Sequence, residues 1–242
     1  MARAPGQVAF QMPRFNNAAT ALAVASVVTS VVWAIAANNG LSLYLSTAEV
    51  ILGGMWWQPF TWLLASRGTG PVLFTALIIW STGGELEARW GPRRFVAFVL
   101  GTTFAAGLLT VAFFAVFPVA LVLVGYNGGE VVFSTIWVAR GIVDWRRVMN
   151  FWGFSITGRT FAMIGVLIAA LNAVFGSLWF LVPEVFGIAI TFAVGFGFGP
   201  GALWLRFTSW RLQQDLKRRA SHLKVVGGES RNMPTNSDKY LH

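Results

Sequence analysis

The sequence contains no cysteine, and it places no histidine or lysine within an apolar segment. Without cysteine the chain can form no disulfide, no thiolate metal site and no thiol nucleophile. Both histidines, His222 and His242, and all the lysines lie in the polar C-terminal tail. No imidazole or amine is therefore available as a general base inside an apolar segment.

Charged residues are also scarce. They make up 11% of the 242 residues, while hydrophobic residues make up 56%. Soluble domains carry about 25% charged residues. The apolar runs are long and do not alternate with polar residues, which is typical of membrane-spanning helices. The composition predicts an all-α integral membrane protein.

The apolar segments predict six transmembrane helices. The expected spans cover residues 18–37, 71–86, 95–117, 127–143, 160–176 and 185–208. Residues 38–70 are less apolar and rich in tryptophan, which favours the membrane–water interface. We therefore expect a partly embedded first loop with short helices. The chain would then consist of a leader (1–17), a six-helix membrane domain (18–208) and a basic tail (209–242).

The basic residues set the expected orientation. With both termini in the cytoplasm, every Arg and Lys except Arg67 lies on the cytoplasmic side, as the positive-inside rule requires. The net charge of +9 is thus explained by topology, and we expect contacts with membrane lipids and none with nucleic acid. The excess of arginine over lysine fits a bacterial inner-membrane protein.

The fourth expected span has a polar, glycine-rich start, Gly125-Tyr-Asn-Gly-Gly-Glu130. Such a start is costly in a membrane helix. Asn127 and Glu130 are three residues apart and share a helix face, and Ser134 follows two turns after Asn127. With Tyr126 they form a candidate binding site. It is either a polar pocket for a partner helix or ligand, or a set of side chains that satisfy one another.

Two motifs resemble the rhomboid superfamily. Trp57-Gln-Pro-Phe-Thr61 follows the start of the expected loop, and Ile79-Trp-Ser-Thr-Gly-Gly-Glu-Leu-Glu87, followed by Gly91-Pro-Arg-Arg-Phe95, ends the second span. With the six expected spans, the resemblance covers most of residues 18–208. It implies a six-transmembrane-helix rhomboid-like bundle with a membrane-embedded first loop. Rhomboids are intramembrane serine proteases, with a Gly-x-Ser-Gly nucleophile on the fourth span, a His-x-x-Gly base on the sixth and His-x-x-x-Asn on the second.

Each catalytic position that the resemblance implies is replaced in this chain. Asn127 stands where rhomboids have the nucleophilic serine. Pro71 and Thr75 stand at the His and Asn positions of the second span, and Phe196 or Phe198 at the base position of the sixth. The resemblance therefore implies a pseudoprotease, not an enzyme.

An active intramembrane serine protease with a non-standard site stays open as the alternative. Ser134 is its candidate nucleophile, but it has no histidine or lysine nearby in sequence to activate it. The aspartates are all expected in the cytoplasm, which excludes a membrane-embedded aspartate pair. We find no motif for a metal or cofactor and expect neither.

A row of glycines, Gly195, Gly197, Gly199 and Gly201, lies on the sixth expected span. Small residues let membrane helices approach closely, and in rhomboid-like folds this face packs against the fourth span. With the chemistry lost and the fold retained, the expected role is to bind transmembrane helices of other membrane proteins. The chain would then be a scaffold, an assembly factor or an accessory subunit of a stable multi-subunit membrane complex.

Overall fold

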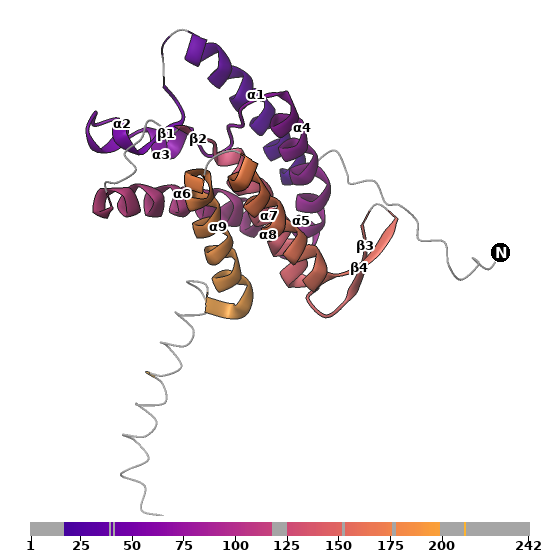
Figure 1. Ribbon diagram of the computed structural model, residues 1–242. Helices are drawn as coiled ribbons and strands as arrows, with labels where there is room; N and C mark the ends of the chain where they lie inside the picture. The colour runs from indigo at the N-terminus through magenta and orange to yellow at the C-terminus, as the bar shows by residue number, and fades with distance from the viewer. Residues whose placement is uncertain are drawn as a thin grey trace, which may run out of the picture. The chain divides into compact units, whose positions relative to one another are not determined.

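Helices make up most of the structure, a computed structural model that describes residues 17–38, 40, 42–117, 125–151, 153–175, 178–198 and 211. They are α1 (Ala18–Asn38), α2 (Thr47–Ile51), α3 (Gln58–Thr61), α4 (Thr69–Ile78), α5 (Gly84–Trp90), α6 (Pro92–Val116), α7 (Gly128–Val143), α8 (Gly158–Phe175) and α9 (Leu181–Ala193), with the π-helical turns η1 (Ile79–Gly83) and η4 (Val194–Phe198) and the 3-10 turn η3 (Leu178–Phe180) (Figure 1). The chain divides into two units, Met1–Gly199 and Pro200–His242, and all described residues but Arg211 belong to the first.

Among the described residues, three helical segments are long and apolar enough to cross a membrane: α1, α6 and Leu178–Phe196. The helix surfaces fit a lipid environment. On α1, Val28 and Val32 are more than half exposed, whereas Ser26 and Ser30 are buried. A helix in the hydrocarbon core of a membrane exposes apolar side chains to lipid and turns its hydroxyl groups towards the protein interior. The prediction of a mostly helical, multi-pass membrane protein is confirmed, while the number of six spans stays a prediction.

The N-terminus of α1 is held by acceptors from two sides. The side chain of Asn17 accepts from the backbone N–H of Thr20 at 2.9 Å, as an N-cap residue does. The Glu87 carboxylate of α5 accepts from the N–H groups of Ala18 at 3.0 Å and Ala19 at 2.7 Å. A carboxylate is favoured at a helix N-terminus by the helix dipole, so this contact joins α1 to α5.

The second expected span, residues 71–86, is part of a longer helical run. α4, η1 and α5 follow one another from Thr69 to Trp90. The run ends at Gly91, whose φ of 81° lies in the left-handed region. Pro92 then begins α6, where its missing N–H leaves no helical hydrogen bond unmade.

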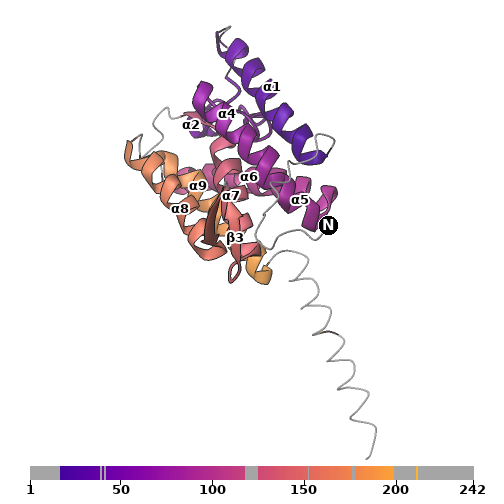
Figure 2. The same cartoon turned by 90° about the vertical axis from the view of Figure 1, so that its right-hand side faces the viewer.

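α7 is the central helix of the described unit. It packs against α8, α9, α4 and α6, and Figure 2 shows it between the α1–α4 pair and the α8–α9 pair. A Cβ on Gly187 of α9 would lie 2.6 Å from Val131, and one on Gly195 would lie 2.7 Å from Ile142. These two contacts show that α9 runs alongside α7 in the same direction.

The segment between α1 and α4 packs on α6 through the short helices α2 and α3. Its strand β1 (Leu45–Ser46) pairs antiparallel with β2 (Gly125–Tyr126), immediately before α7. The buried Gln58 side chain holds this loop together, because it accepts from the Ser46 N–H at 2.9 Å and donates to the Glu49 carboxylate. The loop contains short helices, as predicted, and the strand pair fixes it to the start of α7.

Two segments between the expected spans form regular structure. Residues 144–159, between the fourth and fifth expected spans, contain a hairpin of β3 (Val148–Phe151) and β4 (Phe154–Thr157). Residues 177–184, between the fifth and sixth expected spans, include η3 and the start of α9. Pro183 lies in the first turn of α9, where a helix tolerates proline.

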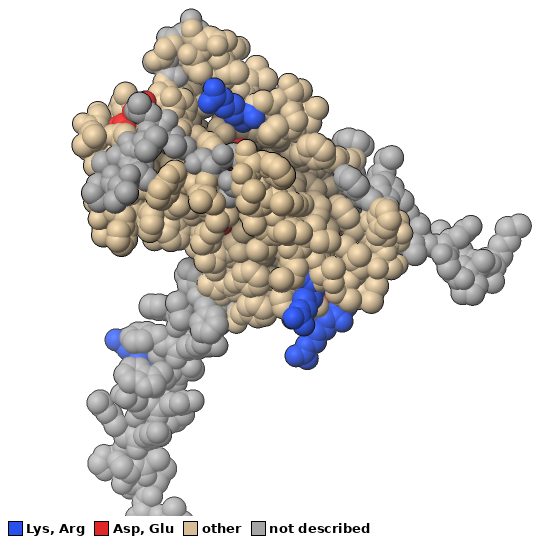
Figure 3. Space-filling view, in the orientation of Figure 1, with Lys and Arg blue, Asp and Glu red and all other residues tan. Residues whose placement is uncertain are grey.

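A network of ion pairs joins α5 to the C-terminal end of α7. The Asp144 carboxylate binds Arg89 at 2.6 Å and also Arg140, which in turn binds Glu85 at 2.5 Å. Burial alone would raise the pKa of Asp144, but the hydrogen bonds from both arginines outweigh it and hold this pKa below its usual value. In Figure 3, charged side chains lie at both ends of the visible face, with uncharged surface between them.

We expect Asp144→Asn to lower the free energy of unfolding by about 1–3 kcal/mol, because it removes the anion that Arg140 and Arg89 share. Arg140 is buried, whereas solvent partly screens Arg89 and reduces its contribution. Since the folded pKa is depressed, the stabilisation is present above about pH 4, the ordinary pKa of Asp, and is lost as the pH falls through the folded value.

Reversible unfolding in mixed detergent micelles measures this effect. The control is Glu85→Gln, because the Glu85 side chain is 54% exposed and should cost less than about 1 kcal/mol. Equal losses in the two variants would contradict a structural role for the Asp144 network.

Candidate functional site at the start of α7

The first turn of α7 lies directly against the backbone of residues 62–66. The N–H of Gly128 donates to the Trp62 carbonyl at 3.1 Å, and the N–H of Gly129 donates to the Ala65 carbonyl at 2.9 Å. A Cβ on Gly128 would lie 2.3 Å from the Trp62 carbonyl oxygen, so the contact requires glycine. Two of the amides that a helix N-terminus leaves unpaired are satisfied here.

A chain of hydroxyl groups links this contact to α1 and α4. Thr75 of α4 donates to the Gly129 carbonyl at 3.3 Å, and Ser66 donates to the Thr75 hydroxyl at 3.4 Å. The Ser66 N–H donates to the Ser30 hydroxyl of α1 at 2.9 Å. Thr75, singled out by the rhomboid resemblance, thus lies beside the first turn of α7, while Pro71 is exposed one turn earlier on α4.

Two carboxyl groups and two carboxamides interact with one another near the start of α7. Asn127 Nδ2 donates to Glu130 Oε1 at 3.5 Å, and both residues are partly exposed. Glu184 of α9 is 2% exposed. It interacts electrostatically with Glu130 and hydrogen-bonds Asn172 of α8. We call Asn127, Glu130, Asn172 and Glu184 the acidic cluster.

The acidic cluster has more acceptors than donors. Glu184 Oε2 is buried and has no hydrogen-bond partner among the described residues. A charged Asp, Lys or Arg at the centre of a membrane helix costs about 2.5–3.5 kcal/mol, and a buried acceptor without a donor is also unfavourable. The arrangement therefore suits a ligand or partner that brings a hydrogen-bond donor.

The other two candidate residues are buried by their neighbours. Ser134 donates to the Glu130 backbone carbonyl at 2.7 Å and is 2% exposed, so its hydroxyl is engaged by its own helix. Tyr126 is buried, and its ring stacks on Phe114 with centroids 6.2 Å apart. Of the four predicted binding residues, only Asn127 and Glu130 are accessible.

The structure does not bring Phe196 to Asn127. Phe196 packs on Trp145, with centroids 5.7 Å apart, just beyond the C-terminal end of α7. Phe198 ends η4, about four helical turns after Glu184. Because α9 runs parallel to α7 and Gly187 meets Val131, the residue level with the start of α7 is Glu184.

The sequence analysis did not place Glu184 in a site, although the sequence contains a pattern that indicates its position. A carboxyl group three residues before a glycine in an apolar segment places both on one helix face. Of the glycine row, Gly195 contacts α7 and Gly197 lies within η4. Gly199 and Gly201 lie outside the described residues.

No protein-family model and no curated protein matches this sequence. In the described part of the chain, no group of three or more His, Cys, Asp or Glu side chains could hold a metal ion. The fold and site together define a mostly helical, multi-pass membrane protein with an acidic cluster at the start of its central helix.

We expect Gly128→Ala to lower the free energy of unfolding by about 1–3 kcal/mol, because the new methyl group must displace the Trp62 carbonyl, which is itself hydrogen-bonded. Gly101→Ala in α6 is the matched control, since a Cβ there meets nothing within 4 Å. The control should be neutral or stabilise the protein by up to about 1 kcal/mol. Unfolding in detergent micelles compares the two, and a Gly128→Ala variant as stable as the control would contradict the close contact.

Proposed function

We propose that this chain is a rhomboid-like protein without proteolytic activity that binds transmembrane helices of other membrane proteins. In this role it would be a scaffold, an assembly factor or an accessory subunit of a larger complex. We place it in a bacterial inner membrane with both termini in the cytoplasm. The observation that carries the proposal is an exposed apolar strip on α8 that ends at the acidic cluster.

The strip on α8 has the spacing of a helix-binding face. Met163, Leu167, Leu171 and Val174 are between 42% and 69% exposed and recur every three or four residues. Lipid would cover such a strip equally well. What favours a protein helix is the polar end of the strip, where Asn172 contacts Glu184. A partner with a hydroxyl or amide group at that depth would satisfy the cluster, and such interhelical hydrogen bonds are worth about 0.6–2 kcal/mol.

The local geometry also supports the loss of proteolysis. Asn127 has an amide in place of a nucleophile, and the N–H groups of Gly128 and Gly129 are already bound to carbonyls, so they are not free to stabilise an oxyanion. Under this proposal the base position of the family falls on Glu184-Val-Phe-Gly187 instead of on Phe196 or Phe198.

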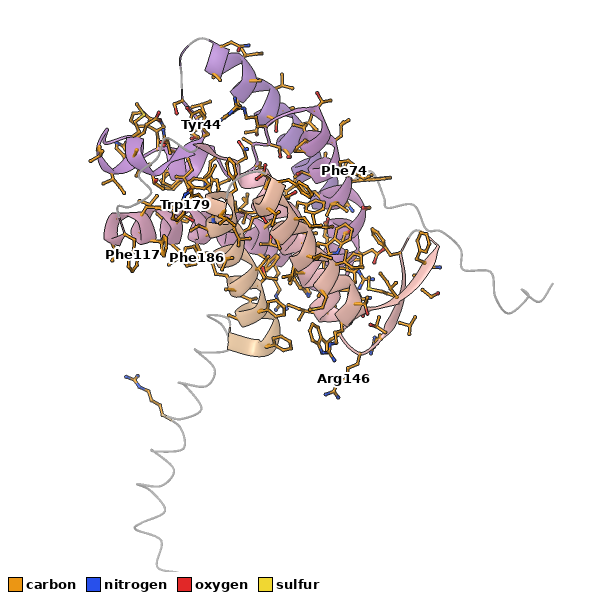
Figure 4. All side chains as sticks on the ribbon, viewed as in Figure 1. Tyr44, Phe74, Phe117, Arg146, Trp179 and Phe186 are labelled. Atoms are coloured by element: carbon orange, nitrogen blue, oxygen red, sulfur yellow. The ribbon has the colours of Figure 1, made fainter. Side chains whose placement is uncertain are left out.

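The charge distribution supports the proposed orientation. Arg89 and Arg140 lie near the C-terminal end of α7, and Figure 4 shows Arg146 at the same end. Arg67 directly follows the segment 62–66, which contacts the N-terminal end of this helix. This asymmetry follows the positive-inside rule when Arg67 faces away from the cytoplasm.

We expect Asn127→Ser to remain unable to cleave a transmembrane model substrate in liposomes, because no imidazole or amine lies in the apolar segments. Gel analysis of the substrate measures cleavage, with a fluorophosphonate probe to test Ser134 in the unaltered protein. Cleavage by Asn127→Ser that disappears when Glu184→Gln is added would show that a carboxylate serves as the base, and it would overturn the proposal.

Helix binding is tested by photo-crosslinking from the strip. A photoreactive phenylalanine analogue at Leu171 should crosslink membrane proteins in native membranes. The same analogue at Val28, which is 55% exposed on α1, is the control for a surface that contacts lipid. Adding Glu130→Gln should leave folding intact and reduce the Leu171 crosslinks about threefold to tenfold, since one interhelical hydrogen bond is weakened. Equal yields from Leu171 and Val28 would indicate that α8 faces lipid alone.

A further inference from the structure

A cavity of about 750 Å³ lies between the C-terminal half of α1, the loop that follows it and the start of α4. The elements that line this cavity contribute no residue to the acidic cluster. Its walls differ in character. Val31 of α1 and Leu73 of α4 are 52% and 61% exposed and form an apolar side, while Ser42, Glu49 and Arg67 form a polar side.

The polar side carries one negative and one positive charge that do not neutralise each other. Both hydrogen bonds to the Glu49 carboxylate, from Ser42 at 2.6 Å and from Gln58, go to Oε2. They hold the carboxylate in place, and Oε1 has no hydrogen bond from a described residue. Arg67 forms no ion pair with any residue that the structure describes. A ligand that carries both a cation and an anion matches this pair of charges.

Aromatic rings complete the polar end of the cavity. Trp33 and Tyr44 line it with ring centroids 5.5 Å apart (Figure 4 shows Tyr44 in the loop after α1). Tyr44 is held against β2, because a Cβ on Gly125 would lie 2.4 Å from its ring. Aromatic faces attract ammonium groups, and Trp and Tyr gather where lipid headgroups lie.

We propose that this cavity binds a zwitterionic phospholipid. The phosphate is bound by Arg67, the ammonium group by Glu49 Oε1 beside the aromatic rings, and the acyl chains lie along Val31 and Leu73. The apolar side favours a lipid over a soluble zwitterion, because it continues onto the exposed faces of α1 and α4. The paired charges favour a zwitterionic headgroup over an anionic one, because a phosphate without a cation would meet the uncompensated Glu49 carboxylate.

Native mass spectrometry of the full-length protein in detergent tests the proposal with dioctanoyl phosphatidylethanolamine, dioctanoyl phosphatidylglycerol and free phosphoethanolamine. Phosphatidylethanolamine should bind at least about tenfold more tightly than either of the other two. Arg67→Gln should weaken its binding about tenfold, and Arg67→Lys should restore most of it. Glu49→Gln should remove the preference over phosphatidylglycerol.

Two controls separate a site from general lipid adhesion. Glu85→Gln and Arg159→Gln remove charges outside the cavity and should leave all three affinities unchanged. The unfolding midpoint of each variant verifies its fold. Equal binding of the two lipids that neither Arg67→Gln nor Glu49→Gln changes would overturn the proposal. Binding of phosphoethanolamine as tight as that of the lipid would also overturn it, in favour of a site for a soluble zwitterion.

Discussion

The first turn of α7 is the contact on which the rest of the structure depends. An amide without a partner costs several kcal/mol in hydrocarbon, and α7 begins with two amides that receive carbonyls from residues 62–66. Gly128 and Gly129 have no side chain, and this permits the backbone of α7 to contact the backbone of residues 62–66. Hydrogen bonds of Ser66 and Thr75 extend this contact to α1 and α4. The contact between residues 62–66 and the start of α7 therefore positions α1, α4, α7 and the first loop.

Both proposed binding regions follow from how this contact shapes its surroundings. On one side, β2 brings Gly125 under the Tyr44 ring and so fixes one wall of the cavity beside Arg67. On the other side, the helix that starts at Gly128 carries Glu130 towards Glu184 on α9. A polar, glycine-rich helix start, which is expensive in a membrane, thus supports two surfaces of different chemistry.

The sequence predicts what depends on local pattern. Long apolar runs locate α1 and α6, and the three-residue spacing of Asn127 and Glu130 predicts that their side chains meet. It does not predict features that depend on which helices become neighbours. Glu184 becomes part of a site only because Gly187 sets the register of α9 on α7. The sixth expected span begins at residue 185, whereas α9 begins at Leu181 and includes Glu184. The charges of Glu49 and Arg67 line one cavity only once the first loop has folded.

The two ends of α7 hold carboxyl groups in opposite ways, and this contrast separates structure from function. At the C-terminal end, Asp144 is bound by two arginines, so its charge is compensated and it joins α5 to α7. At the N-terminal end, the Glu130 and Glu184 side chains interact electrostatically, and among the described residues only carboxamides donate hydrogen bonds to them. A protein that needed these carboxyls for stability alone could place an arginine or an apolar residue there at lower cost. Two carboxyl groups without a cation are understandable here if the missing hydrogen-bond donor comes from a molecule that binds at this end.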